Sequence, residues 1–513
     1  MNYLHVELPS LHLLWQREGC EDVVCSVIRT NYPKPSPLLV AAILRQVQGL
    51  EVQVIDMKIH NQETIIPYRE FNFENGKIIA SRMGMSFEKI EDQLKEADFL
   101  GLSINPTSWS NIALDFARFA KKVNPSLRII IGGTEAIFRY DFYLKSGVID
   151  FVIRGEGELV GPALITSLIH KQDYSGINGL AYIQNGQIVD TGITRNCDLD
   201  KEPLPAIDLL NGDIPLWNMP IEYFIDSDVK RPIMPLFITR GCNQSCDYCT
   251  TPRKYGRLRF KSLERLEKEL QYFKSFGIES INIWDDSLSS LIKLGQRDLL
   301  IAYIRMIKAY GFPFEYAQGM VISDLWDKEK NEPDFVLISE LYGHSTISGK
   351  FVGCYGHYTP VEFLQEENTT AINSKLLSFE KELEVIKAIC RQDVKYLSFS
   401  CILGRATDGP NQVEFARKRL RRIKALVESF GVRILIAPYM YNIFPGTRLW
   451  TKEKDRLEYS IEEFPEMYQL NASPHGTNYF SPSELMQAKL DLEREFLGEE
   501  RFKKWIQTGR YQW

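Results

Sequence analysis

RGCNQSCDYC, residues 240–249, is the stretch on which the interpretation of the whole chain depends. Cys242, Cys246 and Cys249 follow a C-x3-C-x2-C spacing directly after a predicted buried strand. Three thiolates on one short loop can point at a single centre, and soft thiolates bind iron–sulfur clusters or zinc. The stretch therefore predicts a metal centre at the end of a strand.

The number of thiolates distinguishes the two kinds of metal centre. Structural zinc normally takes four protein ligands, but after these cysteines the next Cys in the sequence is Cys354 and the next His is His344. A cluster with three protein ligands leaves one iron open to a cofactor or substrate. The alternative is a zinc loop that a distant residue such as His357 closes. The spacing favours the iron–sulfur cluster.

The cysteine stretch begins a series of alternating strands and helices in residues 233–455. About six βα units are too few for the usual eight-stranded barrel, so we expect a partial (β/α)6 TIM-type barrel. The expected strands are 236–239, 280–284, 314–317, 351–354, 397–403 and 434–439, and the expected helices are 263–276, 296–310, 379–391 and 412–430.

An earlier α/β series occupies residues 1–195. Its alternation predicts an N-terminal doubly wound, Rossmann-like parallel sheet, and Asn185-Gly186 predicts a hairpin turn. We expect 196–232 to be a linker and 456–513 to be a small helical C-terminal region. The expected strands are 51–56, 99–104, 127–131 and 151–154, with helices at 38–47, 112–123 and up to 169.

Bulk composition narrows the class of protein. The chain has 513 residues and a formal net charge of −6, which does not indicate a nucleic-acid partner. Its nine cysteines are scattered and odd in number, which favours metal binding in a reducing cytosol over a disulfide framework. The sequence shows no signal peptide and no apolar run long enough for a membrane span, so we expect a cytoplasmic protein.

The cysteine motif resembles that of the radical S-adenosylmethionine (SAM) superfamily, and Tyr248 holds its aromatic position before the third cysteine. The resemblance implies a 4Fe–4S cluster on Cys242, Cys246 and Cys249 whose open iron binds SAM. It also implies that one electron, from an external flavodoxin- or ferredoxin-like reductant, cleaves SAM to a 5′-deoxyadenosyl radical. That radical abstracts hydrogen from an unactivated position.

Other segments resemble SAM contacts of the same superfamily. Asp285 and Asp286 resemble the motif that contacts the SAM amino group, and acidic caps of the following turn are the alternative. Glu362 resembles a residue that touches the ribose or carboxylate, although P-V-E replaces the expected G-x-E. Gly404 resembles a glycine that lets a strand approach adenine, and residues 445–447 (PGT) resemble the end of such barrels. Ordinary turns are the alternative for both.

The front domain resembles the cobalamin-binding domain that precedes the radical SAM core in one large subclass. Ligands of such sheets bind outside the carboxyl ends of the strands, and glycines there allow close approach to the backbone. The resemblance implies that the Ser-bearing and Gly-Gly segments line the slot for the dimethylbenzimidazole tail. The implied cobalamin residues are Ser103, Asn105, Gly132, Gly133, Gly155 and Glu156.

One motif of classical cobalamin proteins is missing. The D-x-H-x-x-G sequence supplies a cobalt-ligating histidine in those proteins, whereas His60 follows Asp56 at the wrong spacing and without the glycine. Many radical SAM relatives bind cobalamin without this histidine. The lower cobalt face would then meet water or a side chain near residues 103–109. The alternative is a domain that keeps the fold but holds no cobalamin.

Cobalamin beside a radical SAM cluster implies methylation of an unactivated sp3 carbon of a small-molecule or peptide substrate. In the resembled mechanism a substrate radical captures the methyl group of methylcobalamin. One alternative is oxidation, cyclisation or rearrangement with the same cofactors, and another is a front domain without cobalamin. A zinc-loop interaction protein is the non-enzymatic alternative. His357 and Tyr358 lie near the predicted barrel mouth, where they could contact substrate or serve a structural role.

Overall fold

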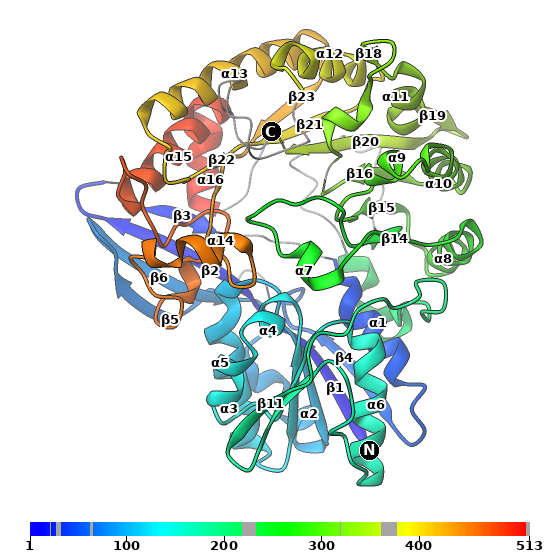
Figure 1. The fold of residues 1–513 in the computed structure, drawn as a ribbon, viewed down its shortest axis with the longest axis vertical. Coiled ribbons are helices and arrows are strands. Elements are labelled where there is room, and N and C mark those ends of the chain that lie inside the picture. Colours follow the sequence, from blue (N-terminus) through cyan, green and yellow to red (C-terminus); the bar gives the residue numbers. More distant parts are fainter. Residues whose placement is uncertain are drawn as a thin grey trace. The chain divides into compact units, whose positions relative to one another are not determined.

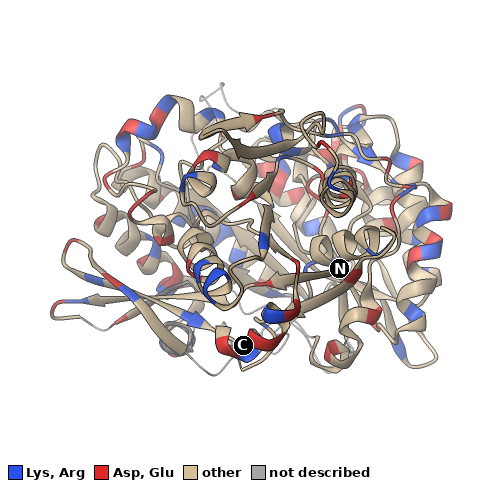
Figure 2. Cartoon of the chain, turned by 90° about the horizontal axis from the view of Figure 1, so that it is seen from below, with Lys and Arg blue, Asp and Glu red and all other residues tan. Residues whose placement is uncertain are grey.

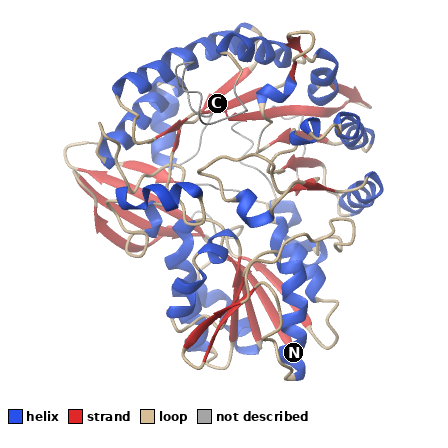
Figure 3. Ribbon diagram, in the orientation of Figure 1, coloured by secondary structure: helices blue, strands red, loops and turns tan. Residues whose placement is uncertain are grey.

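A computed structural model describes residues 1–20, 22–26, 32–61, 65–217, 232–318, 320–360 and 377–508. The fold is mixed α/β with parallel sheets (Figures 1 and 3). The chain forms two compact units whose segments alternate along the sequence. Unit 1 comprises Met1–Trp217, Tyr248–Gly256 and Ile443–Gln469, and unit 2 comprises Asn218–Asp247, Arg257–Asn442 and Leu470–Trp513.

A seven-stranded sheet forms the centre of unit 1. Five neighbouring strands are parallel, in the order β4–β1–β7–β8–β9, and the antiparallel hairpin β10–β11 extends the sheet beyond β9. The strands are β1 (Asn2–Glu7), β4 (Glu51–Asp56), β7 (Phe99–Ser103), β8 (Arg128–Gly132), β9 (Phe151–Ile153), β10 (Leu180–Gln184) and β11 (Gln187–Asp190).

Both faces of this sheet carry apolar side chains, because successive residues of a strand point to opposite faces. Tyr3, Phe99 and Ile130 belong to a buried cluster with residues of two helices on one face. The helices of unit 1 are α1 (Pro35–Leu44), α2 (Glu91–Glu96), α3 (Ser110–Val123), α4 (Thr134–Phe138), α5 (Tyr140–Lys145), α6 (Gly157–His170), α7 (Thr251–Tyr255) and α14 (Arg448–Glu453).

The strand order creates a crevice position for a ligand. The chain passes from β1 outward to β4 and then crosses to β7 on the other side of β1. Ligands of open α/β sheets bind at such a reversal, outside the carboxyl ends of the strands. The carboxyl ends of β1 and β7 therefore flank the expected binding position of unit 1.

Two features of unit 1 were not predicted from sequence. The interior strand β1 is one, because His5 and Glu7 interrupt its apolar run although both are buried. The other is an antiparallel sheet in the order β3–β2–β6–β5. By contrast, the predicted hairpin is confirmed, since Asn185 and Gly186 both have positive φ at its turn. The strands of the second sheet are β2 (Ser10–Arg17), β3 (Val23–Ser26), β5 (Ile65–Asn72) and β6 (Gly76–Met83).

Unit 2 contains six parallel strands in sequence order, as the βα series predicted. They are β12 (Ile233–Leu236), β15 (Ser280–Ile283), β16 (Pro313–Tyr316), β20 (Lys350–Pro360), β21 (Tyr396–Ser400) and β23 (Arg433–Ile436). Short strands accompany them: β13 (Thr239–Arg240), β14 (Arg259–Phe260), β17 (Trp326–Asp327), β18 (Glu332–Pro333), β19 (His344–Ile347), β22 (Ile402–Leu403) and β24 (Tyr439–Met440).

Helices follow the strands of unit 2, and successive helices contact one another. Basic and acidic residues are interspersed along the helices of the chain (Figure 2), and Arg305 of α10 pairs with Glu340 of α11. The helices are α8 (Leu263–Ser275), α9 (Ser290–Lys293), α10 (Arg297–Ala309), α11 (Phe335–Tyr342), α12 (Phe379–Cys390), α13 (Pro410–Ser429), α15 (Pro482–Leu497) and α16 (Glu499–Thr508).

A buried polar row crosses the strands of unit 2. The Asn282 amide donates to Glu315 Oε1 at 2.6 Å, and the Tyr396 hydroxyl donates to the other carboxylate oxygen. Gly356 lies between Glu315 and Tyr396 in the register, and a Cβ there would lie 2.1 Å from Cε1 of Tyr396. The missing side chain lets the Tyr396 ring pass over β20 and reach Glu315.

Gly356→Ala therefore should disrupt the row, because the added methyl group overlaps the Tyr396 ring. We expect a loss of about 1–3 kcal/mol in unfolding free energy, as for an overpacked core position, measured by urea denaturation. Gly176→Ala is the matched control, since no atom lies within 4 Å of a Cβ at Gly176. Equal stability of the two variants would contradict this role of Gly356.

Burial raises the pKa of Glu315 to about 7. The folded state then holds a proton that the unfolded chain releases near pH 4.5, so the free energy of unfolding should fall as pH rises toward 7. Glu315→Gln should reduce this fall by on the order of 3 kcal/mol, measured by urea denaturation at pH 4.5 and 8. The exposed control Glu329→Gln should retain it, and a Glu315→Gln profile parallel to the wild type would refute this assignment.

Candidate functional site

The base of the cysteine loop is fixed by a short ladder in unit 2. Thr239 pairs with Phe260, and Arg240 pairs with Arg259, so the chain that leaves toward Cys242 returns beside itself. The Asn243 side chain accepts a hydrogen bond from the Leu258 amide at 3.1 Å. Gly241 has φ +92°, a conformation that favours glycine, immediately before the first cysteine.

The three cysteines differ in burial. Cys242 and Cys246 are buried, and Cys249 is half-buried. The Gln244 and Thr251 amides each lie 3.4 Å from a cysteine sulfur, those of Cys242 and Cys249. Amide donors of this kind favour an anionic sulfur. A set of three thiolates fits an iron–sulfur cluster by its donor chemistry, although among the described residues no three His, Cys, Asp or Glu side chains converge as a metal site requires.

The two neighbouring aspartates have different environments. Asp285 is buried, and its carboxylate accepts hydrogen bonds from the backbone amides of Ile238 and Thr239. Burial raises the pKa of Asp285 to about 7. Asp286 is exposed, and one of its carboxylate oxygens lies 3.4 Å from the Gly241 amide. Asp285 therefore supports the strand that leads to the cysteines, while Asp286 presents its carboxylate beside the loop.

The remaining predicted SAM residues are less informative. Glu362 lies outside the described residues. Gly404 has φ +118°, and a Cβ there would lie 3.1 Å from the Leu485 side chain, so a helix of the same unit packs against it. Tyr248 is half-buried in the segment that belongs to unit 1.

His357 and Tyr358 point to opposite faces of β20. The buried His357 ring accepts a hydrogen bond from the Met320 amide at 3.1 Å, and its other nitrogen lies 3.1 Å from the Tyr342 hydroxyl. Both ring nitrogens are thus engaged, which weighs against His357 as a zinc ligand or substrate contact. Tyr358 is half-buried and shares a hydrogen bond with Ser400. Tyr358 remains the better candidate for a substrate contact.

The predicted Ser, Asn and Gly-Gly residues lie at the carboxyl ends of β7 and β8. The Ser103 hydroxyl lies 3.2 Å from Nε2 of His5, and the Tyr3 hydroxyl lies 3.2 Å from Nδ1 of the same ring. Burial lowers the pKa of His5 to about 4, so the ring is neutral near pH 7. This buried chain fixes the Ser103 hydroxyl against His5 at the carboxyl end of β7.

The two glycines have different functions. Gly133 has φ +94°, and a Cβ there would lie 2.4 Å from the Ile104 carbonyl oxygen. At Gly132 the nearest atom to a Cβ would be 3.8 Å away, on Ile153. Gly133 therefore serves the close packing of the turn, whereas a Cβ at Gly132 would make only ordinary van der Waals contact. Contact of either glycine with cobalamin stays a prediction.

Gly155 and Glu156 have internal partners at the carboxyl end of β9. A Cβ at Gly155 would lie 2.0 Å from the Thr194 carbonyl oxygen. The buried Glu156 carboxylate accepts a hydrogen bond from the Cys197 amide at 2.8 Å. Both residues thus hold the chain that follows the hairpin, and their contact with cobalamin stays a prediction.

The segment Tyr248–Gly256, which begins one residue before the third cysteine, packs within unit 1. The Lys254 ammonium donates to the Thr134 hydroxyl at 2.8 Å, and Arg253 donates to the Gly446 carbonyl at 2.9 Å. Gly446 in turn packs against Phe138, because a Cβ there would lie 2.2 Å from the ring. Both ends of α4 are therefore contacted by residues that follow the cysteines or belong to the PGT stretch.

Sequence reasoning missed Lys254 and Thr134. Lys254 resembles any surface lysine of a short basic helix, and Thr134 differs from other threonines only in following Gly132-Gly133. Their proximity depends on which parts of the chain fold together. The one available signal was position, since each residue closely follows a predicted cofactor motif.

Two ion pairs lie at the carboxyl ends of β1 and β4, with both carboxylates and Lys58 buried and Lys34 half-buried. Glu7 pairs with Lys34, and Asp56 pairs with Lys58. The Lys34 ammonium also lies 3.9 Å from the centre of the Trp109 ring. Burial lowers the pKa of Lys34 and raises the pKa of Asp56. The carboxyl ends of these two strands thus carry pairs of lysine with a carboxylate.

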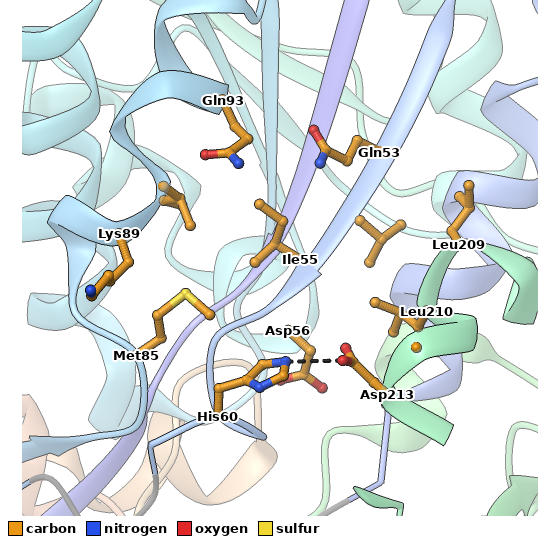
Figure 4. A pocket seen from close by; sticks show the side chains of 13 residues that line it. Gln53, Ile55, Asp56, His60, Met85, Lys89, Gln93, Leu209, Leu210 and Asp213 are labelled. Carbon is orange, nitrogen blue, oxygen red and sulfur yellow. Dashed lines mark hydrogen bonds and ion pairs between the residues drawn. The ribbon is translucent and has the colours of Figure 1, made fainter. Parts of the chain in front are cut away.

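His60 instead lines a cavity of about 370 Å³ beside the outer edge of β4 (Figure 4). Its Nε2 lies 3.0 Å from Asp213 Oδ1. Gln53 and Gln93 lie at the opposite end of the cavity in Figure 4. None of the residues predicted to bind cobalamin lines this cavity.

Comparison with known proteins identifies two domains. The family described as the B12 binding domain matches residues 21–165. The radical SAM superfamily matches residues 236–318. The matches confirm both predicted cofactor classes at the level of domains: cobalamin for the first, and SAM with a 4Fe–4S cluster for the second.

Curated relatives include methyltransferases and a cyclase. An uncharacterized methyltransferase of Pyrococcus horikoshii is 25% identical over 71% of this chain and 72% of its own length. The hopanoid C-3 methylase of Methylococcus capsulatus is 30% identical over 38% of this chain and 37% of its own. The anaerobic magnesium-protoporphyrin IX monomethyl ester cyclase of Synechocystis is 26% identical over 35% of each chain. The chain thus spans about a third of the last two relatives.

Solved structures share the fold. The cobalamin-dependent SAM radical enzyme OxsB, with aqua-cobalamin and SAM bound, aligns over 99% of this chain and 70% of its own, with a TM-score of 0.68 and 15% identity. The radical SAM methyltransferase TsrM of Kitasatospora setae aligns over 89% of this chain and 78% of its own, with a TM-score of 0.56 and 12% identity. The chain thus combines a B12 binding domain with a radical SAM domain, the two domains of the cobalamin-dependent radical SAM enzymes that it resembles.

Proposed function

We propose that this enzyme methylates an unactivated sp3 carbon of a small-molecule or peptide substrate. The observation that carries the proposal is the packing of Tyr248–Gly256, which includes Cys249, within the unit that contains the cobalamin-type sheet. A methyl transfer to a short-lived radical requires both reactive centres within reach of one carbon. The methyltransferases among the relatives support the same reaction.

The residues around the cysteines would bind and orient SAM. Cys242, Cys246 and Cys249 would hold the cluster, which when bound supplies the electron that cleaves SAM. The exposed Asp286 carboxylate is suited to accept a hydrogen bond from the SAM amino group. Asp285 would maintain the strand beneath the loop through the two amides that it accepts. Tyr248, Glu362 and Gly404 are the further proposed SAM contacts.

The carboxyl end of the unit 1 sheet would bind cobalamin, which supplies the methyl group. Ser103, held by His5, and the backbone at Gly132 would receive the nucleotide tail, next to Asn105 and Gly133. Gly155 and Glu156 would border the same slot from β9. The pair of half-buried Lys34 with Glu7, beside Trp109, would lie near the cobalt face for which a histidine ligand is absent.

We infer that unit 1 is a doubly wound Rossmann-like domain and that unit 2 is a partial (β/α)6 barrel. The strand orders and the helices between parallel strands support this. We retain the proposed division into 1–195, linker 196–232, 233–455 and 456–513. The described residues contain no helix that is long and apolar enough to cross a membrane. A cytoplasmic location, a flavodoxin- or ferredoxin-like reductant and the absence of a nucleic-acid partner are part of the proposal.

The cyclase relatives favour a second candidate function. The same cofactors would then catalyse an oxidation, cyclisation or rearrangement without net methyl transfer. In that case SAM would yield 5′-deoxyadenosine as its by-product. Methyl transfer would in addition convert a second SAM to S-adenosylhomocysteine.

The two functions therefore predict different SAM by-products. We expect the reduced enzyme, loaded with both cofactors, to form S-adenosylhomocysteine as well as 5′-deoxyadenosine, measured by mass spectrometry. Formation of 5′-deoxyadenosine alone would favour the second function. The variant with Cys242, Cys246 and Cys249 changed to Ala should form no 5′-deoxyadenosine, whereas the exposed control Cys20→Ala should resemble the wild type.

Asp285 and Asp286 should also be separable. Asp286→Asn should retain iron but weaken SAM binding about tenfold, the effect expected for loss of one charge-assisted hydrogen bond, measured by calorimetry. Asp285→Asn should lower iron retention and thermal stability, because a neutral amide replaces a carboxylate that accepts two buried amides. The reverse pattern would exchange the two assignments.

A further inference from the structure

We propose that Lys254 and Thr134 form a positioning relay that sets the distance between the cluster and the cobalamin. This inference rests on the proposed function, because it concerns the relation of its two cofactors. The residues of the relay are Lys254 of α7, Thr134 at the start of α4 and Asn105 after β7, and all three belong to unit 1.

The hydrogen bonds of the relay have one direction. The Lys254 ammonium donates to the Thr134 hydroxyl at 2.8 Å, and that hydroxyl donates to Asn105 Oδ1 at 3.3 Å. The Thr134 amide donates to the same Asn105 oxygen at 3.2 Å. A hydroxyl can accept from one neighbour while donating to another, so Thr134 is the link on which both ends depend.

The charge and partial burial of Lys254 strengthen its hydrogen bond to Thr134. Lys254 and Thr134 are half-buried. Among the residues that the structure describes, no carboxylate pairs with Lys254, and its ammonium contacts the Thr134 hydroxyl and lies 4.3 Å from the centre of the Tyr255 ring. A charged donor roughly doubles the strength of such a bond. The cation is thereby directed to the turn between Gly133 and α4 and not to a neighbouring acid.

The two ends of the relay belong to different cofactor motifs. Lys254 lies five residues after Cys249 on the same short segment. Asn105 lies two residues after Ser103 and next to the Gly132–Gly133 turn that is proposed to receive the cobalamin tail. A shift at Thr134 would therefore move the third cysteine relative to the sheet edge. A displacement of ~1 Å between reacting centres can cost ~100-fold in rate.

Other contacts should preserve the fold when the relay is broken. Arg253 holds the same segment through the Gly446 carbonyl, and Arg195 donates to the Arg253 carbonyl. Thr134→Val keeps the shape of the side chain but removes both hydroxyl functions. Thr134→Ser keeps the hydroxyl, and Lys254→Met keeps the length of the lysine without its charge. Lys145→Met is the control, because Lys145 is an exposed lysine that pairs with Asp141 on α5.

The test uses the full chain loaded with iron, sulfide and cobalamin. Electron paramagnetic resonance of the reduced cluster with cob(II)alamin reports their distance through the spin–spin interaction, which falls with the cube of the separation. We expect Thr134→Val and Lys254→Met to keep wild-type iron and cobalt contents but to change this interaction. Thr134→Ser and Lys145→Met should match the wild type.

An unchanged interaction in both Thr134→Val and Lys254→Met would overturn the relay, and so would an equal change in Thr134→Ser. Failure of the proposed function has a different signature, because the wild-type chain would then retain no cobalt or show no interaction at all. If either Thr134→Val or Lys254→Met loses iron, the other variant tests the relay, since the two substitutions act on opposite ends of one hydrogen bond.

Discussion

The attachment of Tyr248–Gly256 to unit 1, near the carboxyl ends of its parallel strands, is the constraint on which the proposed chemistry depends. Radical and methyl donor must meet at one carbon, and two cofactors on separately folding parts of a chain would not meet reliably. Here Lys254 donates to Thr134 at the start of α4, the helix that follows the Gly-Gly turn, and Arg253 donates to the Gly446 carbonyl. The phenylalanine at the other end of α4 packs on Gly446. One short helix thus relates the cluster motif to the cobalamin-type sheet.

Buried polar groups maintain the two sites. In unit 2, Asp285 satisfies two backbone amides beneath the cysteine loop, and Glu315 joins Asn282 to Tyr396 across four strands. In unit 1, His5 connects Tyr3 to Ser103. Burial raises the pKa of both carboxyl groups and lowers that of the histidine. Each of these shifts has the same cause, because burial disfavours the charged form of the group.

Much of the fold could be predicted from the sequence, because parallel strands are continuous apolar runs separated by amphipathic helices. The six parallel strands of unit 2 and the Asn185-Gly186 hairpin are examples. The interior strand β1 was missed, since its His5 and Glu7 look like surface residues until their partners are known. The interleaving of the units could not be predicted either, because no local pattern shows that residues 248–256 and 443–469 pack with the first 217.

The candidate site likewise combines features that local sequence predicts with features that depend on tertiary contacts. The spacing of the cysteine motif and the place of the Gly-Gly turn after a strand both indicate cofactor binding. The sequence alone therefore pointed to the matched domains. The separate surroundings of Asp285 and Asp286, and the opposite orientations of His357 and Tyr358, follow from tertiary contacts and the alternation of a strand. Lys254 has no signature of its own, and only its contact with Thr134 shows its position beside both motifs.

Metal analysis of the anaerobically purified chain, with its visible spectrum after corrinoid reconstitution, tests the central claim most directly. The account predicts about four irons and one cobalt on the same chain, with cluster and corrinoid absorption together. Zinc in place of iron, or a complete cluster on a chain that retains no corrinoid, would contradict it.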